Sequence, residues 1–187
     1  MTSTISTTTL PQAGTYLVDP AHTEVGFVAR HLIGTKVRGR FTDVQGTFTV
    51  AENPAESTLE AVIQAASIHT NQAQRDDHLR TNDFLDVATY PTITLHSTGL
   101  RQVGEASWVL TGDLTIRGVT KSVDFDLEFL GEGPSMVEGK NVVAFEARTE
   151  IDRRDFGVSF NHALLDGSVV VGNKVVIEIE VEASLVD

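Results

Sequence analysis

Residues 107–131, SWVLTGDLTIRGVTKSVDFDLEFLG, decide the fold class of this chain. On both sides of the Arg117-Gly118 dipeptide, apolar residues occupy every second position, and after it acidic residues fill several of the positions between them. A period of two places the apolar side chains on one face of a β-strand and the acidic ones on the other. Two such runs joined by a short turn predict an antiparallel hairpin with one buried and one solvated face.

The same alternation recurs along the 187 residues, which include 23 Val, 22 Thr and 9 Ile. These β-branched side chains lose freedom in helices and pack well on a pleated surface. We predict eight strands, at residues 15–32 (bent near Pro20), 38–50, 57–68, 92–102, 107–117, 119–131, 142–152 and 174–185. The predicted fold class is therefore all-β: an eight-stranded antiparallel closed barrel, in which closure removes exposed sheet edges.

One segment departs from the alternation. Asn71 followed three residues later by Gln74 is typical of a helix N-terminus, so we expect one main α-helix that runs to about Arg80. At helical spacing, Asp76 is expected to pair with Arg80 on an exposed face of this helix. Because the cluster at residues 75–80 also contains a histidine, it is the strongest candidate for chemistry, although we interpret it first as structural.

Composition excludes several classes of function. A formal net charge of -12 and a pI near 4.8 predict repulsion from phosphate backbones and anionic lipid surfaces, so no nucleic-acid partner is expected. The absence of cysteine excludes disulfides, thiolate nucleophiles and cysteine-based metal sites. No apolar run is long enough to span a bilayer, so no stable membrane insertion is expected.

The N-terminal residues suggest a location. Residues 1–13 begin with a Ser/Thr-rich run that lacks the cationic start and apolar stretch of a signal peptide. We therefore predict a disordered leader at 1–13, one domain at 14–187 and a cytoplasmic protein.

Catalytic and metal-binding motifs are missing from the sequence. It contains no Gly-x-Ser-x-Gly elbow, no His-Glu-x-x-His and no phosphate-binding glycine loop. The six histidines show no ligand spacing, so neither a metal nor a catalytic residue is predicted. The inward-facing positions instead mix large and small side chains, which suits either a close-packed core or an apolar tunnel. These positions include Phe27, Phe48, Phe125, Phe129, Phe145, Ala29, Ala61, Gly112 and Ala147.

Several ordered motifs resemble those of the YceI-like family of polyisoprenoid-binding, lipocalin-like barrels. They are VDPAHT at 18–23 with VGF at 25–27 and HL at 31–32, VRGRF at 37–41, GTF at 46–48, SIHTN at 67–71, RDDHLR at 75–80, DFLD at 83–86, YP at 90–91, GDLTIRGVTK at 112–121 and RRDFG at 153–157. The resemblance spans about residues 14–184. It implies a barrel extended relative to lipocalins, closed by the helix, with a long isoprenoid chain in its pore.

Two departures accompany the resemblance. His69 stands where the family often has Asp, which adds a titratable group of the opposite charge preference. The segment 132–141 lacks the Trp-Gly-Gly-type loop that is common in the family, so that mouth of the pore is expected to differ. Many relatives also carry a signal peptide.

Alternation and the family pattern together assign the ligand-binding residues. The tunnel wall is predicted to consist of Phe27, Ala29, Phe48, Leu59, Ala61, Ile63, Leu95, Leu110, Leu114, Phe125, Phe145 and Ile177. Leu79, Phe84 and Leu85 are predicted to cap it, and Arg75, His78 and His31 to meet a head group.

The predicted function is non-catalytic binding, storage or carriage of an amphiphilic lipid, a polyisoprenoid or an isoprenoid quinone, with no other cofactor and with a homodimer as one possible assembly. The first alternative is an enzyme that acts on a hydrophobic substrate, with His78 as base at the pore mouth, oriented by Asp77 or Asp76. The second is a small-molecule stress sensor that signals through a protein partner.

Overall fold

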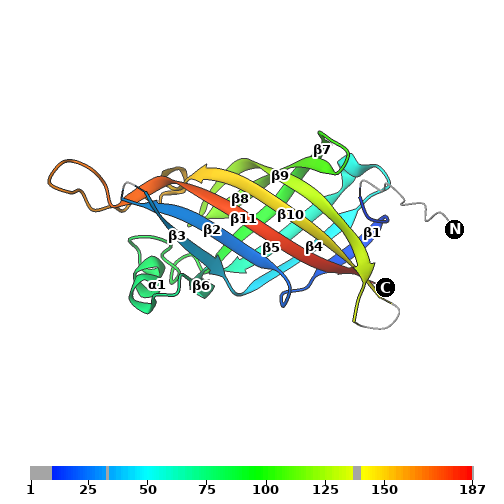
Figure 1. Cartoon of the computed structure of the whole chain (residues 1–187), viewed down its shortest axis with the longest axis horizontal. Helices are drawn as coiled ribbons and strands as arrows, with labels where there is room; N and C mark the ends of the chain where they lie inside the picture. The colour runs from blue at the N-terminus through cyan, green and yellow to red at the C-terminus, as the bar shows by residue number, and fades with distance from the viewer. Residues whose placement is uncertain (1–9, 33, 137–139, 187) are drawn as a thin grey trace.

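The backbone forms a closed, eight-stranded antiparallel β-barrel with a single α-helix at one end (Figure 1). The computed structural model describes residues 10–32, 34–136 and 140–186. The predicted fold class is confirmed, and most of the predicted strand positions agree with the structure.

Two of the eight barrel strands are interrupted. β1 (Gly14–Val18) and β2 (Glu24–His31) both pair with β11 (Val171–Leu185), so together they form one barrel strand with a break at 19–23. β3 (Thr35–Phe41) pairs with β2, and β4 (Val44–Val50) pairs with β1, so these two form the next barrel strand. The pairing of β1 with β11 closes the barrel.

The remaining six barrel strands follow in order. They are β5 (Thr58–Gln64), β7 (Thr92–Gln102), β8 (Ser107–Ile116), β9 (Val119–Pro134), β10 (Asn141–Asp152) and β11. A two-residue strand, β6 (Ile68–His69), extends the wall by pairing with β3. Short 3₁₀ turns lie at η1 (Pro54–Glu56), η2 (Ala65–Ser67) and η3 (Arg153–Phe156). Compared with the predicted bounds, β3 begins three residues earlier, β9 ends three later and β11 begins three earlier.

The break between β1 and β2 is built by the Asp19-Pro20-Ala21-His22 motif. The Asp19 carboxylate accepts hydrogen bonds from the Ala21 backbone N–H (2.9 Å) and pairs with His22 Nδ1 (2.8 Å). The Asp19 N–H donates to the carbonyl of Glu182 on β11, which holds the turn against the barrel. This motif therefore shapes the turn between β1 and β2.

The helix α1 (Ala73–Arg80) lies where it is predicted, but two of its details differ from the prediction. Gln72, not Asn71, caps it by accepting a hydrogen bond from the Arg75 N–H, because Asn71 adopts a left-handed backbone conformation (φ 60°). The predicted Asp76–Arg80 pair is absent: Arg80 pairs with Asp77 (3.1 Å), and Asp76 is buried.

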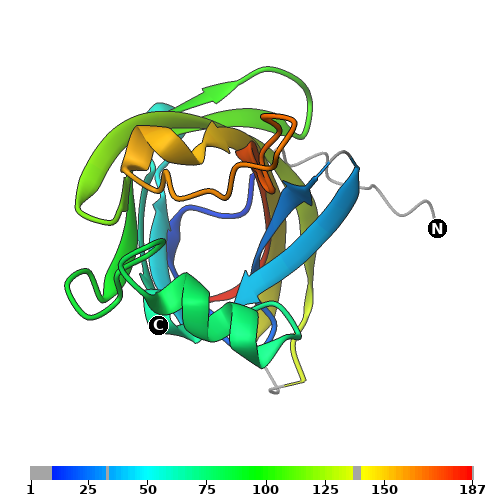
Figure 2. The ribbon, with the colours of Figure 1, turned by 90° about the vertical axis from the view of Figure 1, so that its left-hand side faces the viewer.

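The two ends of the barrel differ. At the end that carries the N-terminal segment, side chains from several strands pack together in a second cluster. There Phe48 stacks on Tyr16, with ring centroids 5.1 Å apart, and meets Phe145 edge to face, with ring centroids 5.6 Å apart. Leu10 is 7% exposed and packs into this cluster, so the last residues of the predicted leader belong to the barrel, while residues 1–9 lie outside the described part. At the other end, α1 and residues 153–161 lie on opposite sides of the barrel mouth (Figure 2).

Candidate functional site

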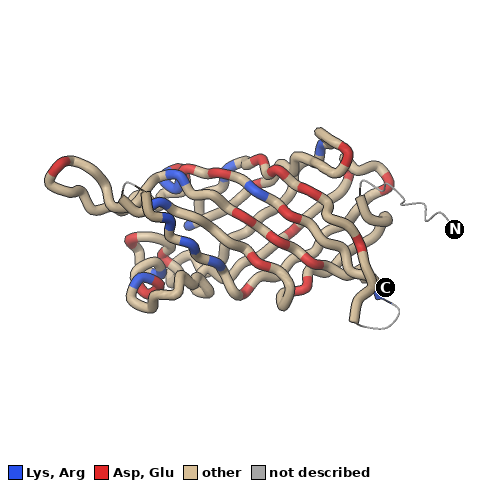
Figure 3. The backbone as a smooth tube through the Cα atoms, in the orientation of Figure 1, with Lys and Arg blue, Asp and Glu red and all other residues tan. Residues whose placement is uncertain are grey.

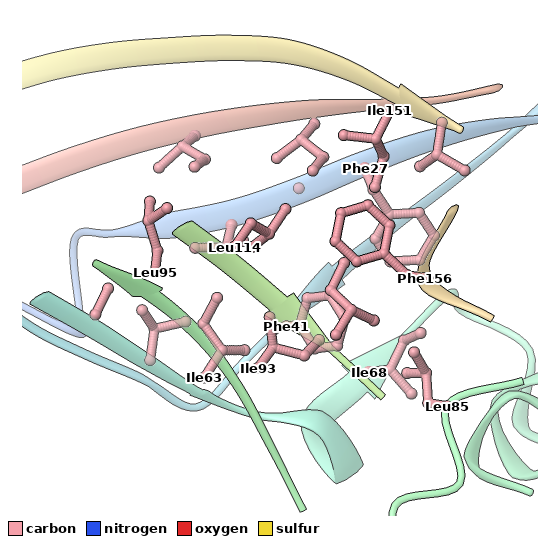
Figure 4. Close-up of a pocket in the computed structure, with 18 of the residues that line it drawn as sticks. Phe27, Phe41, Ile63, Ile68, Leu85, Ile93, Leu95, Leu114, Ile151 and Phe156 are labelled. Carbon is pink, nitrogen blue, oxygen red and sulfur yellow. The ribbon is translucent and has the colours of Figure 1, made fainter. Parts of the chain in front are cut away.

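The interior on the α1 side of the barrel contains a cavity of about 240 Å³. The surface that this cavity presents is entirely apolar. Its wall comes from inward-facing residues of most strands, and from α1 and η3 at one end. Figure 4 shows Phe27, Phe41, Ile63, Leu95, Leu114 and Ile151 around it, with Ile68, Leu85 and Phe156 toward the α1 end.

A second apolar cavity of about 110 Å³ adjoins the first, toward the N-terminal end of the barrel. The two cavities share part of their walls: Leu59, Leu95, Phe125, Ile179 and Val181. Together they reach the lower end of the roughly 300–1,000 Å³ that is typical of small-molecule pockets. Two hydrophobic cavities therefore lie one after the other inside the barrel, and the side chains that line both of them lie between the two.

The structure places most of the predicted wall and cap residues around these cavities. The larger cavity is lined by Phe27, Ala29, Leu59, Ala61, Ile63, Leu79, Phe84, Leu85, Leu95, Leu114, Phe125 and Ile177. The smaller one is lined by Phe48, Leu110 and Phe145 together with Leu59, Leu95 and Phe125. Their contact with a ligand stays a prediction.

The three predicted head-group residues lie outside both cavity walls. Arg75 is committed to its own chain, since its Nε donates to Thr70 Oγ1 (2.7 Å) and its guanidinium to the Thr70 carbonyl (2.8 Å). His31 lies at the end of β2, opposite Val171 and Thr35. His78 stacks edge-on against Phe84, which does line the cavity, with ring centroids 5.1 Å apart.

His78 has a different carboxylate partner from the one proposed in the enzyme alternative. Its Nε2 lies 2.8 Å from Asp83, whereas Asp77 pairs with Arg80, and Asp76 accepts hydrogen bonds from the backbone N–H and hydroxyl of Thr70. The reason is local geometry, because the chain turns back after α1 and brings Asp83 alongside the last helical turn. The prediction that Asp77 or Asp76 orients His78 is therefore wrong.

His69, the residue that departs from the family pattern, faces a buried acid. Its Nδ1 lies 3.3 Å from Asp76 Oδ2, while the other Asp76 oxygen accepts the two hydrogen bonds from Thr70. The Thr70 hydroxyl donates to Asp76 at 2.5 Å and accepts from Arg75. This network ties β6 to α1. In the described ranges, no three or more His, Asp or Glu side chains form a group that could hold a metal ion.

Arg153 borders the larger cavity, and the sequence reasoning did not assign it to the site. It is 6% exposed and lies at the edge of the larger cavity. Its guanidinium donates hydrogen bonds to the carbonyls of Val158 (2.7 Å), Phe160 (3.0 Å) and Gly172 (3.0 Å). These bonds bring the two ends of the segment 158–172 together. Burial lowers the pKa of this side chain from its ordinary value. Arg153 thus holds the two ends of this segment next to each other.

Other cavity residues were also missed, among them Phe41, Ile68, Ile93, Phe156 and Val158. Phe41 and Ile93 have the parity of cavity-facing residues on their strands, so strict alternation would have found them. The others lie in a two-residue strand, a 3₁₀ turn and a loop, where no periodicity exists to indicate which side faces inward.

These observations define a class: β-barrels that enclose an elongated apolar lumen. The chain belongs to the YceI-like family, whose YceI-like domain model matches residues 16–183. The protein YceI of Escherichia coli is 40% identical over 149 residues, which are 78% of this chain and 77% of that protein. A UPF0312 protein of Azotobacter vinelandii is 37% identical over the same length, with the same coverage.

Solved structures agree with this assignment. The YceI protein of Campylobacter jejuni is 31% identical and superposes with a TM-score of 0.71, covering 90% of this chain and 96% of that one. A polyisoprenoid-binding domain from Saccharophagus degradans shares the fold at 16% identity, with a TM-score of 0.69 and coverage of 94% and 100%. No helix among the described residues is long and apolar enough to cross a membrane.

Proposed function

We propose that this protein binds an amphiphilic lipid, with its hydrocarbon chain along the barrel axis, and performs no chemistry on it. The observation that carries the proposal is the apolar surface of the 240 Å³ cavity, which offers a ligand nothing but dispersion contacts and exclusion from water. The buried part of the ligand is therefore hydrocarbon, and any polar head lies at an end of the lumen.

The chemical class we propose is a polyisoprenoid, free or attached to a quinone ring. At about 0.8 kcal/mol per buried CH₂-sized group, each five-carbon isoprene unit contributes on the order of 4 kcal/mol before the costs of ordering the chain. Branched units also suit a wall that alternates large residues such as Phe27 with small ones such as Ala29. The polyisoprenoid-binding domain from Saccharophagus degradans, which has the same fold, supports this choice.

A non-catalytic role is supported by the contacts of the one candidate base. The His78 side chain is 42% exposed, pairs with Asp83, and touches the cavity only through the ring of Phe84. No polar atom of the wall faces the larger cavity, so a buried substrate would meet neither an acid nor a base there. Carriage of the lipid between sites, a cytoplasmic location, the absence of a cofactor other than the lipid and a homodimeric state are further parts of the proposal.

The test is native mass spectrometry of the purified protein, followed by lipid extraction. We expect an added mass that extraction removes and that chromatography identifies as an isoprenoid. The extracted protein should melt at a lower temperature and recover when isoprenoid is returned, because a ligand that binds only the folded state adds to its stability. Stripped and reloaded protein that melt at the same temperature would count against the proposal.

A further inference from the structure

A hairpin at the α1 end of the barrel presents exposed apolar side chains to solvent. Residues 162–170, the tip hairpin, project from the barrel beyond β11 (Figure 1). The hairpin is ordered by the bridge between Ala163 and Val169 and by a hydrogen bond from the Leu164 N–H to the Ser168 carbonyl (2.8 Å). Leu164 is 42% exposed, and Leu165 is fully exposed. Leu165 therefore gains nothing from burial on folding, and Leu164 is only partly buried.

Leu32 extends this apolar surface. It is 48% exposed, and its N–H donates to the carbonyl of Val170 at 2.8 Å, which places it at the base of the tip hairpin. Exposed apolar residues such as Leu17 and Leu130 also occur toward the other end, but there the outward charges are mainly acidic (Figure 3). The α1 end is thus distinguished by what surrounds its leucines.

Those surroundings are basic. On the outward face of β2 and β3, Arg30 is the cross-strand partner of Lys36, and Arg38 and Arg40 follow at alternate positions of β3 (Figure 3). Across the described ranges, no carboxylate reaches ion-pair distance of Arg30 or Lys36. Arg38 and Arg40 have only long ion pairs, of 3.7 and 3.9 Å. We call these four residues the basic ribbon.

The net charge of -12 does not cancel this local charge. β11 has 15 residues, which is about 50 Å of extended strand, whereas the Debye length at physiological ionic strength is about 8 Å. The acidic side chains toward the far end of the barrel are therefore screened from a surface that touches the α1 end. A flat anionic partner would meet the basic ribbon and the tip leucines first.

We propose that the α1 end docks on an anionic lipid bilayer, with the tip leucines among the head groups and the basic ribbon against the surface charge. The tip hairpin adjoins the cavity, because Val171, which follows it directly, and Val158, four residues before it, both line the cavity. Arg153 donates hydrogen bonds to the carbonyls of both residues. A docked barrel therefore receives or releases its lipid at the membrane. That purpose rests on the proposed function, whereas the docking rests on this surface alone.

Within the tip hairpin, one residue opposes the docking. Asp166 is the only acidic residue of the tip hairpin, and its carboxylate accepts hydrogen bonds from the Ser168 hydroxyl (2.6 Å) and N–H (2.9 Å). These hydrogen bonds hold the pKa of Asp166 below its ordinary value, so the carboxylate stays charged. They also direct it toward Ser168 of the same turn. Asp166→Asn should therefore strengthen binding.

The test is co-sedimentation of the full-length protein with vesicles of phosphatidylcholine alone or in equal parts with phosphatidylglycerol. We expect binding to the anionic vesicles only, decreasing with added salt. Arg30→Gln combined with Lys36→Gln should lower the partition coefficient about fivefold for each charge removed. Leu165→Ser should lower it on the order of tenfold. The matched control is Arg101→Gln combined with Val103→Ser, which changes an exposed cation and an exposed apolar residue at the opposite end of the barrel.

Each outcome decides the proposal. Wild-type protein that stays in the supernatant with every vesicle, as expected for a surface that binds a protein partner instead, overturns it. So does a control variant that loses as much binding as the tip and ribbon variants. Isoprenoid capture from detergent, measured on the same variants, separates the two proposals: intact capture without docking refutes only the docking, and absent capture in the wild type refutes only the proposed function.

Discussion

The ring of Phe27 crosses over Gly39, its partner on the adjacent strand, so closely that a Cβ at Gly39 would lie 2.3 Å from Phe27 Cζ. The missing side chain on β3 thus makes room for an aromatic ring on β2 that forms part of the cavity wall. The VGF and VRGRF motifs of the sequence therefore act together, although 11 residues separate Phe27 from Gly39 in the chain.

Gly39→Ala should force the Phe27 ring toward the cavity. We expect a loss of about 1–3 kcal/mol in the free energy of unfolding, which is typical of overpacking, together with weaker isoprenoid binding. Gly99→Ala is the control, because a Cβ at Gly99 meets no atom within 4 Å. Denaturant unfolding and isoprenoid titration of both variants provide the measurement, and equal behaviour of the two variants would contradict the assigned role of Gly39.

The Asp19–His22 pair predicts a pH dependence of the β1–β2 turn. Their mutual hydrogen bond raises the pKa of His22 above 6.5 and lowers the pKa of Asp19 below 3.8. The contribution of His22 is fully present below pH 6.5 and is lost as the pH rises through its folded pKa. The contribution of Asp19 is present above pH 3.8 and is lost as the pH falls through its folded pKa.

The pair therefore stabilises the turn most between pH 3.8 and 6.5. In an NMR titration, the imidazole of His22 should have a pKa above 6.5 in the wild type, and Asp19→Asn should return it toward that value. An unchanged titration curve in the variant would show that Asp19 is not the cause.

Arg153 should be essential for the segment 158–172. Arg153→Met leaves the carbonyls of Val158, Phe160 and Gly172 without their donor, and we expect a loss of about 2–3 kcal/mol in the free energy of unfolding. Hydrogen exchange should accelerate across this segment. The neighbouring variant Arg154→Met is the control, since that side chain is exposed and bonds only Asp152. If both variants unfold alike, Arg153 does not clamp the segment.

Alternation along the strands predicts the barrel and most of the cavity wall, because a period of two fixes which side chains face inward without any knowledge of the rest of the fold. Leu59, Ala61 and Ile63 on β5 follow this rule without exception. Alternation does not predict, however, whether the inward-facing side chains leave an empty volume inside the barrel. The same residues would serve a close-packed core, and only the placement of all eight barrel strands shows that they leave space between them.

Positions set by tertiary contacts were beyond prediction. Helical spacing alone predicts an ion pair between Asp76 and Arg80. In the structure α1 packs against β6, so Asp76 accepts hydrogen bonds from Thr70, and Arg80 forms its ion pair with Asp77. The RRDFG motif at 153–157 gives no periodic signal. Its first arginine could have been suspected from the family motif, but its carbonyl partners lie up to 19 residues away, in the segment 158–172 and at the start of β11, and no local pattern pairs them with Arg153.

Ala61→Phe separates a ligand tunnel from a packed core in one variant. Ala61 lies opposite Leu95 across β5 and β7, and both line the larger cavity, so a phenyl ring at position 61 would occupy space that the lipid takes. The lipid-free variant should unfold almost like the lipid-free wild type, while isoprenoid affinity should collapse. The matched control is Ala183→Phe: Ala183 is 0% exposed in the packed cluster at the other end of the barrel, where overpacking should cost about 1–3 kcal/mol or more. Melting of stripped protein and isoprenoid titration of both variants decide the matter. A large loss of stability in Ala61→Phe with unchanged lipid capture would show that the lipid does not lie in this cavity.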